Sequence, residues 1–259
     1  MKNISEHLRR GSASHKGQNG KVLVIAGSKD FTGAPALSAE AALRAGCDLV
    51  KVLTSQEIKD VVSGYSENLI VEGYNGGYFT QEDVGRALEM SEWADSVVIG
   101  PGLSRPEKQA VKEFVERTDA PLIVDADAIE PAQDADIGQA VFTPHSGELK
   151  SILDEYGTEE RFIEETGAVL VVKGETDKVY TKDGLEEIET GTSAMTVGGT
   201  GDVLTGIIAS LVSQSVELGQ AAALGVTING ESGKICTQEF GNGMLATDLI
   251  EKIPRVIKD

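Results

Sequence analysis

Short apolar runs rich in Val and Ile recur along the chain and alternate with longer segments whose apolar residues fall at helical spacing. Runs of this length and composition are typical of buried strands, and the segments between them are typical of helices. The alternation predicts a three-layer α/β/α fold with a mainly parallel central sheet and helices on both faces. The predicted strands are 21–27, 48–54, 96–100, 121–125, 140–143 and 168–173, and the predicted helices include 36–45, 81–92 and 107–117.

The remaining segments predict a hairpin and a helical last third. Residues 178–181 and 185–189 flank Lys182-Asp183-Gly184, a sequence typical of a tight turn, so we expect a hairpin at the sheet edge. From Asp202 onward the pattern is helical. No Pro/Ser-rich linker or low-complexity tract divides the 259 residues, so we expect a single domain over 1–259.

Closely spaced glycines stand immediately before an apolar, helix-like run at 203–212. Gly198, Gly199 and Gly201 free the backbone there, and unpaired amides in the first turn of a helix point at a bound anion. The loop therefore predicts a phosphate site. Asp202 is unfavourable beside a phosphate unless it takes a proton from a hydroxyl that attacks phosphorus. The alternative is that Asp202 caps the helix.

Polar or glycine-rich residues follow five of the predicted strands. Ligands of parallel sheets bind beyond the carboxyl ends of the strands, so we expect these segments to converge on one site. Any one of them alone is a weak signal, because a Gly-Pro-Gly sequence most often forms only a tight turn. The five segments are 26–28, 100–103, 125–128, 143–148 and 173–174.

The chain is strongly acidic. It has 23 Lys and Arg against 42 Asp and Glu, a formal net charge of -19, which argues against binding of nucleic acid through a basic surface. The acidity fits either a salty cytoplasm or plain solubility. An anionic nucleotide must then be held by local dipoles and a few cations, among which Lys173 is the candidate. The alternative is that Lys173 extends from a strand edge into solvent.

Cysteine and histidine are scarce. Cys47 and Cys236 cannot build a disulfide framework and are expected to be buried, and three histidines argue against a His/Cys metal site. No apolar run approaches the ~20 residues of a membrane helix. Residues 1–6 are polar and acidic where a signal peptide would have its apolar core, which predicts a cytoplasmic location.

Taken together, these motifs resemble the ribokinase-like superfamily, and most closely the NAD(P)H-hydrate dehydratases of the YjeF carboxy-terminal domain type. The most specific part is the order of Thr-Pro-His-x-Gly-Glu at 143–148, Lys-Gly at 173–174 and Met-x-x-Gly-Gly-x-Gly-Asp at 195–202. Related small-molecule kinases share the Gly-x-Gly-Asp loop but commonly have Asn at the position of His145. The resemblance spans nearly the whole chain and favours the dehydratase.

The resemblance implies a lyase that repairs (6S)-NADHX and (6S)-NADPHX to NADH and NADPH, with ADP as the phosphoryl donor, AMP and phosphate as products, and Mg²⁺. It implies that Asp202 is the catalytic base and that Ala34, Gly102 and His145, with Asp202, contact the hydrated dinucleotide. Glu148 either holds Mg²⁺ through water or is an ordinary first-turn residue of a helix. The implied nucleotide contacts are Lys173, Gly174, Glu175, Thr176, Asp177, Gly198, Gly199, Thr200 and Gly201.

Two departures from the family pattern matter. Many members have Gly-Asn-Pro-Gly-Met where this chain has Gly-Thr-Ser-Ala-Met at 191–195, so an Asn contact is missing and the turn is less stiff. The fused amino-terminal epimerase domain is not found, which implies a separate epimerase for the other hydrate.

Related enzymes assemble as homotetramers. The apolar residues of 221–257 would either serve such contacts or pack inward on the sheet.

Two other functions stay open from the sequence alone. A small-molecule kinase would phosphorylate an alcohol, such as a vitamin precursor, with ATP and accumulate a stable phosphoester. A non-catalytic adenine-nucleotide sensor would keep the fold, although the retained Asp202 argues against it. Asp125 and Asp127 look like a carboxylate pair but equally cap the segment that follows, so they are left out of the expected catalytic set. Trp93 and Met195 are interpreted as packing residues.

Overall fold

The strands of the computed structural model, which describes residues 14–258, form a nine-stranded sheet in the order β3-β2-β1-β4-β5-β6-β7-β8-β9. Neighbours from β3 through β7 are parallel, and β8 and β9 close one edge as an antiparallel hairpin. The six predicted strands and the hairpin are confirmed. The bounds are β1 (Lys21–Ile25), β2 (Leu49–Ser55), β3 (Ile70–Tyr74), β4 (Ser96–Ile99), β5 (Leu122–Val124), β6 (Ala140–Phe142), β7 (Val169–Val172), β8 (Asp177–Thr181) and β9 (Gly184–Ile188).

Strand β3 is not foreseen by the apolar pattern. Its sequence, Ile-Val-Glu-Gly-Tyr, contains a charged residue and a glycine, and only its last two residues are buried. An edge strand has one open side and needs no continuous apolar run. The pairing of β3 with β2 depends on tertiary contacts that local sequence does not encode.

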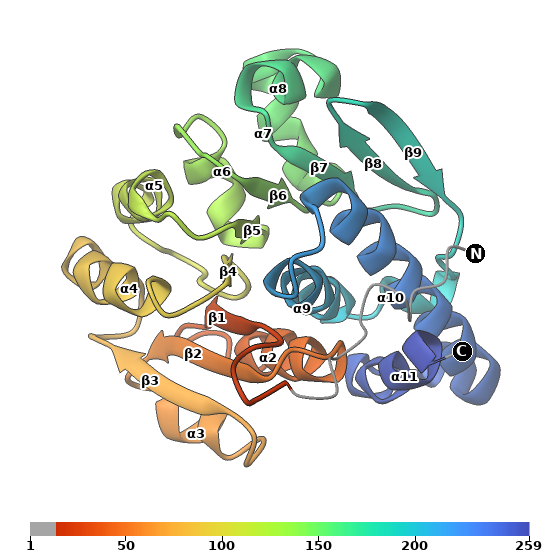
Figure 1. The fold of residues 1–259 in the computed structure, drawn as a ribbon, viewed down its shortest axis with the longest axis horizontal. Coiled ribbons are helices and arrows are strands. Elements are labelled where there is room, and N and C mark those ends of the chain that lie inside the picture. The colour runs from red at the N-terminus through yellow and green to blue at the C-terminus, as the bar shows by residue number, and fades with distance from the viewer. Residues whose placement is uncertain (1–13, 259) are drawn as a thin grey trace.

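Helices cover both faces of the sheet, as Figure 1 shows. They are α2 (Ala34–Arg44), α3 (Lys59–Ser63), α4 (Val84–Ser91), α5 (Lys108–Arg117), α6 (Ile129–Ala132), α7 (Ser146–Tyr156), α8 (Glu159–Thr166), α9 (Thr200–Ser213), α10 (Leu218–Phe240) and α11 (Ala246–Lys258). Alternate residues of β1 enter different layers, because Val22 and Val24 pack with α2, α9 and α10, whereas Leu23 and Ile25 pack with α4 and α5. The predicted three-layer α/β/α fold is confirmed.

The order of the strands reverses at β1. From β1 the chain runs to β2 and β3 on one side, then crosses to β4 and continues outward on the other. The segments that follow β1 and β4 are joined there, because the amide of Gly27 donates to the carbonyl of Pro101 over 2.8 Å. Ligands of open α/β sheets bind at such a switch point, beyond the carboxyl ends of the strands. The glycine-rich segments 26–28 and 100–103 therefore meet where a ligand is expected.

Helix α9 lies closely against α2. A Cβ atom at Gly206 would stand 2.1 Å from the carbonyl oxygen of Ser38, so only glycine permits this approach. At the same contact the hydroxyls of Ser38 and Thr205 are 3.3 Å apart, and both residues are buried. The remainder of α9 packs on β1, β4 and β5. The first turn of α9 is thereby held at the carboxyl edge of the central strands.

Most of the apolar residues in the carboxy-terminal helices pack inward. Leu245 is 56% exposed and Ile235 is half-buried, whereas six other large apolar residues of 221–257 are buried within one chain: Leu224, Val226, Ile228, Leu249, Ile250 and Ile253. For these six the inward-packing alternative is correct. Cys47 and Cys236 are buried as expected. Across residues 14–258, no helix combines the length and the apolar composition needed to cross a membrane.

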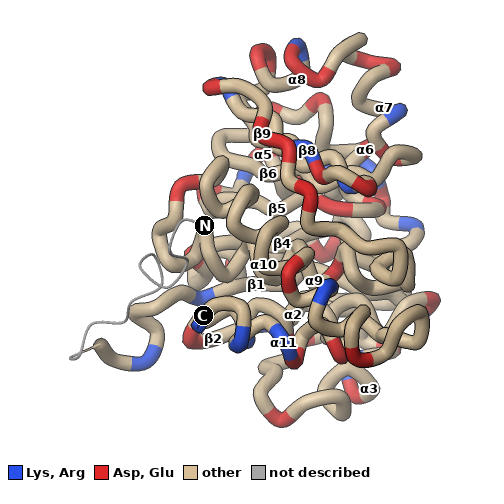
Figure 2. Tube along the Cα trace, turned by 90° about the vertical axis from the view of Figure 1, so that its right-hand side faces the viewer, with Lys and Arg blue, Asp and Glu red and all other residues tan. Residues whose placement is uncertain are grey.

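Acidic residues are spread over the surface. Figure 2 shows Asp and Glu on helices and loops around the trace, with Lys and Arg interspersed among them. Some of these cations pair with acids, as Lys112 does with Asp134 at 3.1 Å. The part of the chain drawn in colour carries no basic stripe of the kind that binds a nucleic-acid backbone.

We expect Gly206→Ala to destabilise the fold by about 1–3 kcal/mol, because the added methyl group must push α9 away from the Ser38 carbonyl. Gly85→Ala in α4 is the matched control, since nothing lies within 4 Å of its Cβ position. That change should instead stabilise the protein by about 0.5–1 kcal/mol through helix propensity. Denaturant unfolding of both variants measures the difference. Equal stability of the two variants would contradict the close packing of α9 on α2.

Candidate active site

The first turn of α9 faces the site without a side-chain cap. Gly199 is the N-cap residue, with φ of +96°, and no side chain of residues 14–258 caps the helix. A Cβ at Gly198 would meet nothing within 4 Å. The unpaired amides are therefore free to bind an anion, as the glycine loop predicts.

Asp202 is not the cap of α9. It is the third residue of the helix, so the capping interpretation is wrong. Burial raises the pKa of its carboxyl to about 7, with a further contribution from the negative charges of Asp125 and Asp127, while Lys173 lowers it. Among residues 14–258, its carboxylate accepts no hydrogen bond from a side chain or amide. A half-buried carboxyl that titrates near neutrality is suited to act as a general base.

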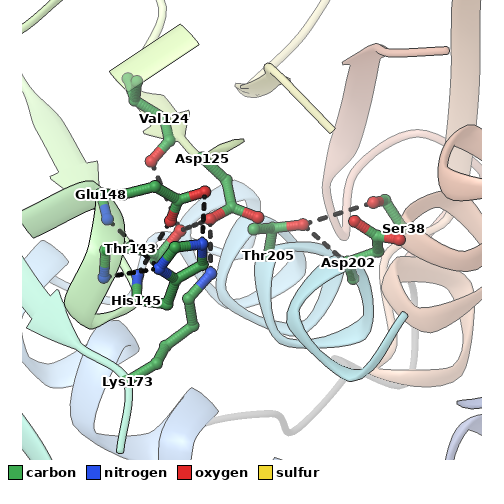
Figure 3. Close-up of polar contacts among 10 residues, drawn as sticks. Ser38, Val124, Asp125, Thr143, His145, Glu148, Lys173, Asp202 and Thr205 are labelled. Atoms are coloured by element: carbon green, nitrogen blue, oxygen red, sulfur yellow. Dashed lines mark hydrogen bonds and ion pairs between the residues drawn. The ribbon is translucent and has the colours of Figure 1, made fainter. Parts of the chain in front are cut away.

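Lys173, Asp125 and Thr143 meet at the ends of three adjacent strands (Figure 3). The Lys173 ammonium donates to Asp125 Oδ1 over 2.7 Å, and the Thr143 hydroxyl donates to the same oxygen over 2.9 Å. Burial disfavours the charge on Lys173, but the charge and hydrogen bond of Asp125, with Glu148 and Asp202, outweigh it and raise the pKa of Lys173. The lysine is paired rather than extended into solvent, so that alternative is wrong.

The Lys173 ammonium lies beside the glycine loop. A Cβ at Gly201 would stand 3.3 Å from Lys173 Nζ, so these two predicted nucleotide contacts are neighbours. The segment that follows is a tight turn in which the amide of Gly174 donates to Asp177 Oδ1 over 2.9 Å. Burial raises the pKa of Asp177. The turn also approaches the strand exit at Gly191, whose Cβ would be 3.3 Å from the carbonyl oxygen of Glu175.

His145 and Glu148 cap α7 together. His145 Nδ1 accepts from the amides of Gly147 and Glu148 over 2.8 and 3.2 Å, and the Glu148 carboxylate accepts from the amide of His145 over 2.9 Å. Glu148 therefore lies in the first turn of α7, and its Oε2 atom serves the cap. The His145 side chain remains 60% exposed beside the strand end of Lys173, with which it forms a backbone bridge. A contact between this imidazole and a ligand is compatible with its place.

Ala34 and Gly102 lie together at the switch point. Ala34 begins α2, and a Cβ at Gly102 would stand 3.1 Å from Ala34 Cβ and 3.0 Å from Phe31 Cβ. Gly102 thus packs against Phe31 and Ala34 as closely as a glycine allows. The two predicted substrate contacts are therefore neighbours at the switch point.

Backbone strain gathers beside these residues. Ala126 has φ of +48° and Ser104 has φ of +64°, both in the left-handed region that non-glycine residues rarely adopt. The two segments are tied together, because the amide of Ser104 donates to Asp127 Oδ2 over 2.7 Å. Burial raises the pKa of Asp127. Asp125 occupies the N-cap position of the short 3₁₀ turn at 126–128 without a side-chain capping bond, and Asp127 lies within that turn.

A cavity of about 400 Å³ adjoins this side of the site and is lined by Asp127, Gly147 and Glu148, among others. A larger hollow of about 1120 Å³ lies at the opposite, amino ends of the strands, around Lys21 and Pro121, away from the convergent polar groups. The smaller cavity adjoins the predicted site through Ala126 and Asp127, which follow Asp125, and through Glu148, which caps α7 with His145.

The sequence predicts that segments 125–128 and 143–148 meet at the site, but it assigns no role to Asp125 or Thr143. Each follows an apolar strand, as Lys173 does, and this shared position at the ends of β5 and β6 was the available signal. Around the site no group of three His, Cys, Asp or Glu within residues 14–258 is arranged to hold a metal ion. A metal ion here would take most of its ligands from a bound phosphate and water.

Comparisons with known proteins agree with this geometry. The family model described as NAD(P)H-hydrate dehydratase matches residues 22–255. The chain is similar to the ADP-dependent (S)-NAD(P)H-hydrate dehydratases of Haloterrigena turkmenica and Natrialba magadii, with 47% and 46% identity over 93% of each chain. It is also similar to the crystal structure of the ADP/ATP-dependent NAD(P)H-hydrate dehydratase of Bacillus subtilis co-crystallised with ATP/Mg²⁺. That structure has 27% identity and a TM-score of 0.83, over 98% of this chain and 95% of that one.

We expect Asp202→Asn to stabilise the folded protein at pH 8 by roughly 1–2 kcal/mol, and much less at pH 5. The folded pKa near 7 lies above the unfolded value of about 3.9. The free energy of unfolding of the wild type therefore falls as the pH rises through this window, whereas Asn stays neutral. Denaturant unfolding at both pH values measures the effect. Asp119→Asn, on an exposed turn, is the control, and a destabilised Asp202→Asn at pH 8 would refute the raised pKa.

Proposed function

The chain belongs to the NAD(P)H-hydrate dehydratase family, and we propose that it dehydrates (6S)-NADHX and (6S)-NADPHX to NADH and NADPH with ADP as the phosphoryl donor. The observation that carries the proposal is the place of Asp202, a carboxyl with a pKa near 7 in the uncapped first turn of α9. The relatives with 46–47% identity are named ADP-dependent, which supports ADP.

The chemistry requires activation of a poor leaving group. Asp202 accepts the proton of the ring hydroxyl as its oxygen attacks the terminal phosphorus of ADP, and the bond from that phosphorus to AMP breaks. The ring nitrogen lone pair then expels phosphate, and loss of a proton from the neighbouring carbon restores the dihydronicotinamide. The amides of 198–201 and the Lys173 ammonium stabilise the charge on the transferring phosphoryl group.

The site suits Mg²⁺ held mainly by the nucleotide. Magnesium takes one or two carboxylates and completes its octahedron with phosphate oxygens and water. Glu148, whose side chain is 22% exposed at the same strand edge, would supply the carboxylate. When bound, Mg²⁺ would neutralise negative charge on the phosphoryl group. Of the nucleotide contacts, we assign the phosphates to 198–201 and Lys173, and the rest of ADP to 174–177.

We further propose that residues 1–259 form one catalytic domain. We also propose that the protein is cytoplasmic and assembles as a homotetramer. Phe240 and Leu245, 47% and 56% exposed, supply apolar surface that assembly would cover. Several relatives, such as that of Methanothermobacter thermautotrophicus with 34% identity, are named bifunctional NAD(P)H-hydrate repair enzymes, and the chain covers 51% of that protein. An epimerase would convert the other epimer into the (6S) hydrate that this enzyme uses.

Incubation with acid-generated NADH hydrate and ADP tests the function. We expect recovery of the dihydronicotinamide absorbance with release of AMP and phosphate, and a higher kcat/KM with ADP than with ATP freed of ADP. Asp202→Asn should bind ADP with little change and lose turnover by at least about 10²-fold. Turnover of the variant within threefold of the wild type would overturn the assignment of the base. Accumulation of a stable phosphoester would point to a kinase instead.

His145→Ala should weaken binding of the hydrated dinucleotide more than binding of ADP, because we place the imidazole on the substrate side of the cleft. The change also removes the cap of α7, at a cost of about 1 kcal/mol. His145→Asn is the matched control, since Asn keeps a cap but loses the imidazole. Calorimetric titrations of each ligand separate the two effects. If both variants lose affinity for ADP alone, His145 belongs to the nucleotide site.

A further inference from the structure

Asp125 is a buried carboxylate that the proposed reaction does not yet use. Its side chain is 3% exposed at the end of β5, and its Oδ1 atom accepts from both Lys173 and Thr143. A buried charge is tolerated only when it is paired and hydrogen-bonded. The opposite charge of Lys173, 2.7 Å away, meets that requirement. The pair therefore forms one unit in which each partner fixes the other.

The backbone of Asp125 is held on both sides. Its amide donates to the carbonyl of Ile99 over 3.1 Å. Its own carbonyl oxygen would lie 1.8 Å from a Cβ at Gly100, so β4 approaches as closely as a glycine allows. The next residue, Ala126, adopts the strained φ of +48°. Strain of this kind persists only where the surrounding structure fixes the backbone. Here the contacts with Ile99 and Gly100 fix the backbone that carries the Asp125 carboxylate.

The ion pair packs against the first turn of α9. A Cβ at Gly201 would stand 3.3 Å from Lys173 Nζ and 3.9 Å from Asp125 Oδ2. The absent side chain leaves the ammonium beside the amides that receive the phosphate in the proposed function. Lys173 reaches this place from a strand two positions away from β5 in the sheet, and Asp125 is the side chain that holds its Nζ atom there.

On the basis of the proposed function, we propose that Asp125 is a positioning residue, which holds the Lys173 ammonium against Gly201 so that the cation meets the transferring phosphoryl group without rearrangement. A preorganised charge costs no reorganisation at the moment of reaction. The Asp125 carboxylate also raises the pKa of the proposed base, Asp202. The charged groups that act on Asp202 are Asp125 and Asp127, which raise its pKa, and Lys173, which lowers it.

Asp125→Asn tests the proposal, because it keeps the shape and removes the charge. We expect kcat to fall roughly tenfold or more, with a smaller change in the KM for ADP. The acid limb of the pH profile of kcat/KM should move down by about one pH unit, because a negative charge near Asp202 is lost. A purely structural role would not move this limb. An unmoved limb with kcat within twofold of the wild type overturns the proposal.

Two further variants separate the contact between Asp125 and Lys173 from the general effect of a negative charge near Asp202. Asp127→Asn removes an equal charge that does not touch Lys173, so its shift of the acid limb should be the smaller one. Asp125→Asn should add little to the loss caused by Lys173→Gln, because the two residues act as one unit. Losses that multiply in the double variant would show that Asp125 does not act through Lys173.

A titration that needs no turnover distinguishes this proposal from the proposed function. Carboxyl NMR follows the protonation of Asp202 in the wild type, in Asp125→Asn and in Thr143→Val, which removes one of the two hydrogen bonds to Oδ1. The Asp202 midpoint should fall in Asp125→Asn and move little in Thr143→Val. An unchanged midpoint in Asp125→Asn refutes the inference whether or not the wild type dehydrates the hydrate. An inactive wild type with the expected midpoints refutes only the proposed function.

Discussion

The close approach of α9 to α2 at Gly206 is the constraint on which the site depends. Because the Ser38 carbonyl occupies the space of a side chain, α9 lies deep against the sheet and its first turn reaches the strand ends. A second missing side chain, at Gly201, then leaves room for the Lys173 ammonium. The start of α9 therefore combines absent side chains with free amides.

This construction explains how a chain with a net charge of -19 can bind an anion. The charge of Lys173 is already matched by Asp125 at 2.7 Å, so in the proposed site the pair would attract a phosphate through its orientation more than through its net charge. The uncapped amides of α9 and the helix dipole supply the remaining attraction. Such short-range dipoles act at contact distance and are little affected by acidic residues on the distant surface.

Sequence patterns predict those parts of the fold and of the site that depend on residues close together in the chain. The central strands are short and apolar because both faces are covered, so their positions can be read from composition alone. The glycine loop is likewise a contiguous motif. Strand β3 and the Asp125–Lys173 contact are different, because one depends on an edge pairing and the other joins residues 48 positions apart. An Asp after a strand caps or pairs according to what approaches it in space, and no local pattern holds that information.

His145 shows how the two kinds of information combine. The sequence marks it as unusual, but the capping geometry determines its chemistry, since Nδ1 accepts two amide hydrogens and so carries no proton. Its other ring nitrogen, Nε2, lies 3.3 Å from Glu148 Oε1. A ligand that contacts this edge meets a hydrogen-bond donor and competes with Glu148 for it. The cap of α7 thereby fixes which ring nitrogen His145 presents to its surroundings, because Nδ1 is occupied by the two amides.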